Sequence, residues 1–241
     1  MFGYLYFTSD NNEPPVLLTS MLFNAEKYID KIIVVTTADL KKKLSFLFPR
    51  LTILLDDSIP QFKAEKYYIS NINQKVISSN HPPTELLCLR RWTVLHYLYA
   101  NQYVSTDDIC INLDWDNILF DSIRTLNRFV ENNHILDAPL LVCFNRMGIR
   151  GSSIENKMPI YEICPSLMYT NKSTIEVYNS YLTNILQNKN LLINEFSNRF
   201  FNDMCVWSIT LSHINLKEKK SISLDLDEIG EELSVFADHN V

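Results

Sequence analysis

The sequence predicts a single α/β domain, built on a mixed and mostly parallel β-sheet that is flanked by helices. Strand-like and helix-like segments alternate at the start of the chain, which is the pattern of a parallel half-sheet. Hydrophobic residues make up 46% of the 241 residues, enough to bury the core of one large domain. No internal repeat and no linker-like stretch divides the chain.

The first third of the chain is expected to contain three strands and two helices. Each strand is a short, continuous apolar or β-branched run, as expected where both faces of a strand are buried. Pro14 and Pro15 favour the start of the first helix, because proline is tolerated in a first helical turn. The strands are predicted at residues 2–7, 31–37 and 51–55, and the helices at residues 14–28 and 38–48.

The rest of the chain continues the alternation. Residues 84–100 are apolar nearly all round, so this helix is expected to be buried between layers. A helix capped by Asp121 or Ser122 should extend to about residue 132. Further strands are predicted at residues 67–69, 108–113, 139–144 and 162–169, and further helices at residues 172–187 and 195–211.

Charge and composition exclude several classes of protein. The net charge of -6 argues against a nucleic-acid-binding surface, which needs a clustered basic stripe. No apolar run is long enough to cross a membrane, and the first residues lack the basic leader of a signal peptide. The five cysteines form no CxxC pair and are expected to be reduced. We therefore expect a soluble, cytoplasmic protein.

The most informative motif is the pair of carboxylates Asp114 and Asp116, which follows an apolar strand. Strand side chains alternate with period two, so both are expected to point to the same side. Such a pair beyond the carboxyl end of a strand suits Mg²⁺ or Mn²⁺, which also binds phosphate oxygens. The alternative is an Asp-rich turn without a function, because Asp favours turns.

The surroundings of this motif resemble those of GT-A-fold glycosyltransferases. In that family an Arg-containing helix, here residues 84–101, precedes an apolar strand that ends in D-x-D, here within residues 108–120. Residues 164–182 and 202–204 also resemble acceptor-side elements of bacterial or viral surface-glycan transferases. The layout matches over most of residues 1–210, but the match is specific only around the D-x-D motif.

The resemblance implies a GT-A (Rossmann-like) fold and a metal-dependent glycosyltransferase. The donor would be a nucleotide-diphosphate sugar carrying UDP, GDP or dTDP, the cofactor Mn²⁺ or Mg²⁺, and the acceptor a hydroxyl group, such as that of a glycan. Residues 1–120 would be the nucleotide-sugar-binding half, residues 121–215 the acceptor-side half, and residues 216–241 a C-terminal tail.

The same resemblance assigns roles around the metal. Asp116 would be a direct metal ligand, and Asp114 would contact the metal, its bound water or the ribose. Trp115, between them, would belong to the donor site. His213 or His239 would serve as a third ligand, as in some GT-A enzymes, although either histidine is also compatible with a structural role.

Other candidate residues surround the nucleotide. Asp56 or Asp57, after the third strand, would bind the base, and Thr8 and Ser9, after the first strand, would meet the nucleoside. Each also fits an ordinary turn.

The remaining candidates are basic or act on the acceptor. Arg90 and Arg91 lie in the apolar helix, and a buried guanidinium needs an anionic partner, either the diphosphate or a structural carboxylate such as Asp114. Arg150 lies in a Gly-containing basic loop that would form a flap over the diphosphate, or a solvated surface loop. Asp203, with Glu195 second, is the candidate general base, although a retaining enzyme needs none.

Three rival functions are compared with this interpretation, and the first of them uses the same residues. LDWDNILFD resembles the first motif of haloacid-dehalogenase-type phosphatases, with Asp114 as nucleophile, but Ile118 stands where that motif carries Thr or Val. A sugar-nucleotide pyrophosphorylase would show a Gly-rich basic loop after the first strand, which is missing here. A non-catalytic glycan-binding module would need no metal pair.

Overall fold

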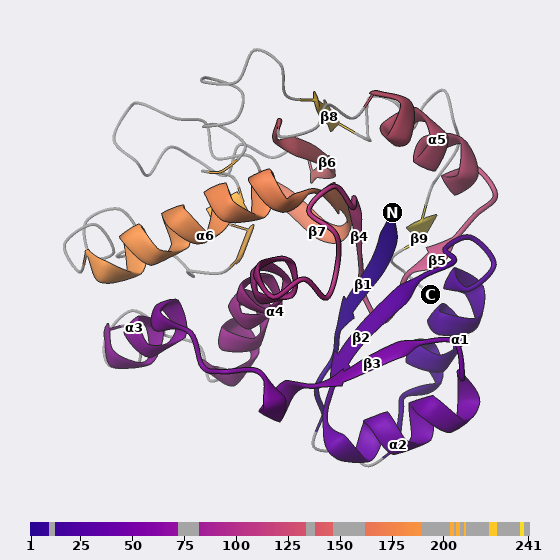
Figure 1. Cartoon of the computed structure of the whole chain (residues 1–241), viewed down its shortest axis with the longest axis horizontal. Coiled ribbons are helices and arrows are strands. Elements are labelled where there is room, and N and C mark those ends of the chain that lie inside the picture. Colours follow the sequence, from indigo (N-terminus) through magenta and orange to yellow (C-terminus); the bar gives the residue numbers. More distant parts are fainter. Residues whose placement is uncertain are drawn as a thin grey trace.

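The computed structural model arranges the chain around one central sheet (Figure 1). Within the described residues this sheet has seven strands, in the order β3-β2-β1-β4-β7-β6-β8. The strands are β1 (Phe2–Tyr6), β2 (Ile32–Thr36), β3 (Thr52–Leu55), β4 (Cys110–Leu113), β6 (Leu140–Arg146), β7 (Glu162–Thr170) and β8 (Ile222–Asp225). The described residues are 1–9, 13–71, 82–133, 138–146, 162–188, 203, 204, 206, 207, 210, 222–225 and 237–238.

The sheet is mixed and mostly parallel, as predicted. β1 is parallel to both β2 and β4, and β2 is parallel to β3. β7 is antiparallel to its neighbours β4 and β6, whereas β8 is parallel to β6. Because β1 to β4 all run in one direction, their carboxyl ends meet at one edge of the sheet.

Helices cover both faces of the sheet. Figure 1 shows α3, α4 and α6 on one face and α1, α2 and α5 on the other. Strand side chains alternate between the two resulting cores: Ile33 and Val35 of β2 belong to the first, and Ile32 and Val34 to the second. The helices are α1 (Val16–Ala25), α2 (Ala38–Leu47), α3 (Lys63–Asn71), α4 (Pro82–Ala100), α5 (Ile123–Asn133) and α6 (Lys172–Gln187).

The structure corrects one predicted element. Residues 67–69, predicted as a short strand, belong to helix α3. Ala64 and Tyr68 are buried with the i, i+4 spacing of one helix face, and this helix lies against α4 and α6. Tertiary packing therefore overrides the strand propensity of the Tyr-Tyr-Ile sequence.

The C-terminal region predicted as a tail contributes strands. Besides β8, it supplies β9 (Ala237–Asp238), which pairs antiparallel with β5 (Ile118–Leu119) in a second, two-stranded sheet. β5 begins two residues after the D-x-D motif, so this pairing joins the C-terminal region to the segment that follows the candidate metal site. Among the described residues, no helix has the length and apolar character needed to cross a membrane.

Candidate functional site

The predicted nucleotide and metal residues that the structure describes lie after the parallel strands, at their carboxyl edge. β1 and β4 are neighbours, and the rings of Phe7 and Trp115, which follow them, are 6.0 Å apart. Ligands of open α/β sheets bind at this edge. The residues in question are Thr8 and Ser9 after β1, Asp56 and Asp57 after β3, and Asp114, Trp115 and Asp116 after β4.

The D-x-D motif forms a turn and not the end of a strand. β4 ends at Leu113, and the backbone N–H of Asn117 donates to the carbonyl oxygen of Asp114 at 3.3 Å, which closes the turn. The period-two alternation of a strand, on which the sequence argument depended, is therefore not what directs the two carboxylates. The Asp114 side chain is 30% exposed and Asp116 is half-buried, so both remain open to solvent.

Helix α1 and the C-terminal region anchor the segment after this turn. The side-chain amide of Asn24 in α1 donates to the carbonyl oxygen of Leu119 at 3.0 Å and accepts from its N–H at 2.6 Å. The neighbouring Ile118 pairs with Asp238 of β9. The chain is thus fixed at both ends of the D-x-D turn, by β4 before it and by these contacts after it.

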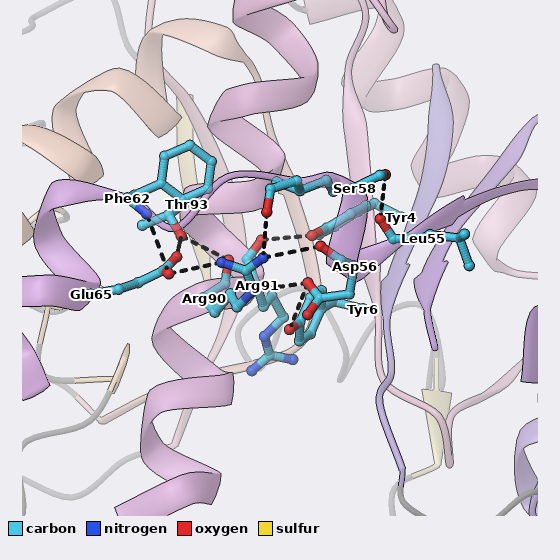
Figure 2. A network of polar contacts seen from close by, with 11 residues as sticks. Tyr4, Tyr6, Leu55, Asp56, Ser58, Phe62, Glu65, Arg90, Arg91 and Thr93 are labelled. Carbon is cyan, nitrogen blue, oxygen red and sulfur yellow. Dashed lines mark hydrogen bonds and ion pairs between the residues drawn. The ribbon is translucent and has the colours of Figure 1, made fainter. Parts of the chain in front are cut away.

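Arg90 of α4 forms a network with the loop after β3 (Figure 2). Its Nε donates to Asp56 Oδ1 and its Nη1 to Glu65 Oε2, both at 2.8 Å. Nη2 donates to the backbone carbonyl oxygens of Asp56 at 3.3 Å and Ile59 at 3.1 Å. The hydroxyl of Tyr6 adds a further hydrogen bond to Asp56 Oδ1 at 3.2 Å. The candidate base-binding carboxylate of Asp56 is therefore held firmly in place.

Burial shifts the pKa of several groups in this network. It raises the pKa of the Glu65 carboxyl, and Arg90 and the Thr93 hydroxyl offset part of that rise. Burial and the charge of Asp56 raise the pKa of Tyr6, so its hydroxyl stays protonated at neutral pH and donates to Asp56. Burial alone would lower the pKa of Arg90, but the charges of Glu65 and Asp56 raise it.

Arg91, the next residue of α4, contacts different groups. Its Nη1 donates to Asp114 Oδ1 at 2.6 Å, and its Nη2 donates to Asp203 Oδ2 at 2.9 Å. Burial alone would lower the pKa of its guanidinium, but the charges of the two carboxylates raise it. Arg91 therefore pairs with Asp114 of the D-x-D motif, the carboxylate that the sequence offered beside the diphosphate as a partner.

Asp203, the predicted general base, is 3% exposed. Its Oδ2 accepts hydrogen bonds from Arg91 and, at 2.9 Å, from the indole N–H of Trp92. Val206 and Trp207 are buried with the helical spacing i+3 and i+4 from Asp203, and the ring of Trp207 lies 4.8 Å from that of Trp92. The role of general base stays a prediction, and this burial favours a role in positioning neighbouring groups.

The chemistry of the D-x-D turn fits a hard divalent cation. Mg²⁺ and Mn²⁺ prefer carboxylate oxygens and commonly keep water and phosphate oxygens as their other ligands. Within the described residues, no group of three or more His, Cys, Asp and Glu side chains could hold a metal ion. The other predicted residues, Arg150, Glu195, His213 and His239, lie outside the described residues.

The sequence did not reveal the residues that support Arg90 and Asp56. Glu65, Thr93 and Tyr6 were not singled out, although each contacts the Arg90 network. The only available signal was a rule of burial, because an arginine in an apolar helix must find anionic partners. Nothing in the sequence marked Asn24 as important, since its role depends on a contact with β5 that forms only in the folded chain.

The sequence matches no model of a known protein family and no curated protein sequence. Among solved structures, mouse xyloside xylosyltransferase 1 is similar, with a TM-score of 0.55 and 12% identity over 92% of this chain and 84% of that one. The galactosyltransferase LgtC, solved with donor and acceptor sugar analogs, has a TM-score of 0.53 and 12% identity over 92% and 73%. These similarities confirm the predicted GT-A (Rossmann-like) α/β fold.

Proposed function

We propose that this protein is a glycosyltransferase that moves a sugar from a nucleotide-diphosphate sugar to a hydroxyl acceptor, in a reaction that depends on Mn²⁺ or Mg²⁺. The observation that carries the proposal is the position of Asp114 and Asp116. The two carboxylates lie on a turn at the carboxyl edge of the parallel strands, half-open to solvent. The fold, shared with two glycosyltransferases of known structure, supports the same class of reaction.

Each end of the site has a defined role in this proposal. Asp114 and Asp116 hold the cation, which when bound would offset the charge that develops on the leaving diphosphate. Asp56, fixed by Arg90 and Tyr6, accepts an N–H group of the base, and the exposed Asp57 is the alternative. Thr8 and Ser9 lie against the nucleoside, and the 37% exposed Trp115 packs on the donor.

The acceptor side of the proposal depends on residues beyond those just named. Asp203 has its Oδ2 engaged by two donors, which leaves Glu195 as the better candidate for the general base that accepts the hydroxyl proton. Arg150 would cover the diphosphate from the basic loop. His213 or His239, both outside the described residues, would supply a further metal ligand.

The test is ligand-dependent thermal stabilisation, followed by transfer assays with the stabilising donor. UDP-, GDP- and dTDP-sugars are screened with and without Mn²⁺, because a ligand that binds only the folded state raises the Tm. At a hundredfold excess over Kd, the matching donor should raise the Tm by about 5–10 °C for a chain of this size. Asp116→Asn should abolish the Mn²⁺-dependent part of that rise and the transfer activity.

Asp107→Asn is the matched control, because Asp107 is an exposed acidic residue that precedes β4, at the opposite edge of the sheet. It should respond to donor and Mn²⁺ like the wild type. Full activity of Asp116→Asn, or activity that is unaffected by EDTA, would show that the assignment of the metal site is wrong. Turnover of p-nitrophenyl phosphate that is lost in Asp114→Asn would favour the phosphatase alternative.

A further inference from the structure

Arg91 connects two carboxylates that are far apart in the sequence. The guanidinium divides its two terminal nitrogens, with Nη1 on Asp114 Oδ1 at 2.6 Å and Nη2 on Asp203 Oδ2 at 2.9 Å. A guanidinium often binds one carboxylate with both nitrogens, and here it spans two instead. Asp203 therefore helps to determine where the guanidinium lies, and the guanidinium determines which way Asp114 points.

One oxygen of Asp114 remains available in this arrangement. Oδ1 is engaged by Arg91, and Oδ2 has no hydrogen-bond partner among the residues that the structure describes. The side chains of Arg91 and Asp203 are 10% and 4% exposed, whereas that of Asp114 is 30% exposed. The buried members of the triad thus orient the open member toward the edge of the sheet, where a cation would bind.

Asp203 also changes the charge that a cation meets. Arg91 and Asp114 alone would be neutral as a pair, and the guanidinium would compete with the metal for the carboxylate. The second carboxylate offsets the charge of Arg91 and leaves Asp114 with more negative charge to offer. The protein holds Asp203 in place for this purpose through the indole N–H of Trp92, at 2.9 Å, and through the packing of Trp207 against Trp92.

From this geometry we infer that Arg91 and Asp203 are positioning residues for the metal ligand Asp114, and that Asp203 acts through Arg91 on metal affinity. The inference rests on the proposed function, because it takes Asp114 as a metal ligand. It gives Asp203 a role different from that of a general base. It also makes the affinity for a divalent cation depend on a residue that lies 89 positions after Asp114 in the sequence (203 − 114).

The test is direct titration of the full-length protein with Mn²⁺, in which free Mn²⁺ is followed by electron paramagnetic resonance. Asp203→Asn keeps the shape and the hydrogen-bond acceptor but removes the charge. It should weaken Mn²⁺ binding about tenfold, the usual scale for groups that orient a metal ligand. Arg91→Lys keeps the charge but cannot span both carboxylates, and it should weaken binding by a similar factor. The double variant should be no weaker than about the worse single variant, since both act through one contact.

Glu65→Gln is the matched control. Glu65 is also 3% exposed and is paired with the neighbouring Arg90, but it has no contact with Asp114. The Mn²⁺ affinity of Glu65→Gln should stay within about twofold of the wild type, even if the variant is less stable. Circular dichroism confirms that each variant is folded, and Arg91→Lys decides the question if Asp203→Asn does not fold.

Steady-state kinetics separates the positioning role from base catalysis. If Asp203 positions Arg91, Asp203→Asn raises the KM for Mn²⁺ about tenfold, and saturating Mn²⁺ restores most of kcat. If Asp203 is the general base, kcat falls while Mn²⁺ affinity stays unchanged, and added Mn²⁺ restores nothing. That second result would overturn the inference alone. A wild-type protein that binds no Mn²⁺, with or without UDP, would overturn the proposed function together with it.

Discussion

Arg90 and Arg91 are consecutive residues of one helix, but they serve two different strand ends. Arg90 faces the loop after β3, where it binds one carboxylate of that loop, two backbone carbonyl oxygens and the buried Glu65. Arg91 faces the turn after β4 and donates to the carboxylates of Asp114 and Asp203. Successive side chains of an α-helix are about 100° apart, so adjacent arginines can reach separate sites from the same backbone.

The two networks differ in how many contacts each makes around its carboxylate. Around Arg90, Asp56 Oδ1 accepts from both Arg90 and Tyr6, and Glu65 accepts at both of its oxygens. Around Arg91, one oxygen of Asp114 is engaged and the carboxylate stays 30% exposed. The Arg90 network thus holds its loop at several points around Asp56, whereas Arg91 holds the D-x-D turn through one hydrogen bond to Asp114 Oδ1. The comparison can be tested one network at a time.

Removing Arg91 should have the largest effect on stability. Arg91→Met leaves the buried Asp203 without its cationic partner, and breaking a buried ion pair in this way costs about 3–5 kcal/mol. Urea unfolding measures the loss. Arg50→Met, at an exposed arginine, should change the unfolding free energy by less than about 0.5 kcal/mol. A loss below about 1 kcal/mol for Arg91→Met would mean that the pair with Asp203 is not a buried anchor.

Glu65→Gln should have a smaller effect that depends on pH. Burial raises the folded-state pKa of Glu65, so its contribution to stability is present below the ordinary pKa and is lost as pH rises through the raised value. The variant should therefore lose about 1–2 kcal/mol in acid, and less at neutral pH. Urea unfolding between pH 4 and pH 7 measures this difference.

The exposed Glu131 supplies the control for this experiment, because Glu131→Gln should leave the pH dependence of stability unchanged. A destabilisation by Glu65→Gln that grew with pH would have the opposite sign. It would mean that attraction to Arg90 outweighs burial, and that the pKa of Glu65 is lowered in the folded protein.

Much of the fold could be predicted from the sequence because its elements are locally encoded. Continuous apolar runs gave the buried parallel strands, and the helix at residues 172–187 was predicted with the bounds that the structure shows. The strand prediction for residues 67–69 was wrong because strand propensity is a local property, whereas the packing that makes these residues helical involves α4 and α6. The strands β8 and β9 were missed because short segments near the C-terminus gain their partners only in the folded chain.

The candidate site was predictable in its residue types and not in its connections. A buried arginine needs an anion, and this rule correctly indicated that Arg91 has one. Its partners lie 23 and 112 residues away, a separation that no local pattern encodes. The D-x-D motif was likewise found from its carboxylates, although their turn geometry was considered only as the alternative without a function. Residue types therefore indicate which chemistry is possible, whereas the fold determines which residues pair.

The smallest expected effects on stability come from substituting two tyrosines of β1, one of which contacts each network. Tyr4 donates to the carbonyl oxygen of Arg91 at 2.6 Å, and Tyr6 donates to Asp56 Oδ1 at 3.2 Å. Tyr4→Phe and Tyr6→Phe should each cost about 1 kcal/mol of stability, the usual net value of one hydrogen bond.

Only Tyr6→Phe should weaken binding of the nucleoside diphosphate, by about two- to fivefold, because it alone loosens the carboxylate proposed to bind the base. Calorimetric titration with UDP in the presence of Mn²⁺ measures both variants. An equal loss of affinity in the two would show that β1 acts as one rigid support, and that Asp56 has no separate part in binding the nucleotide.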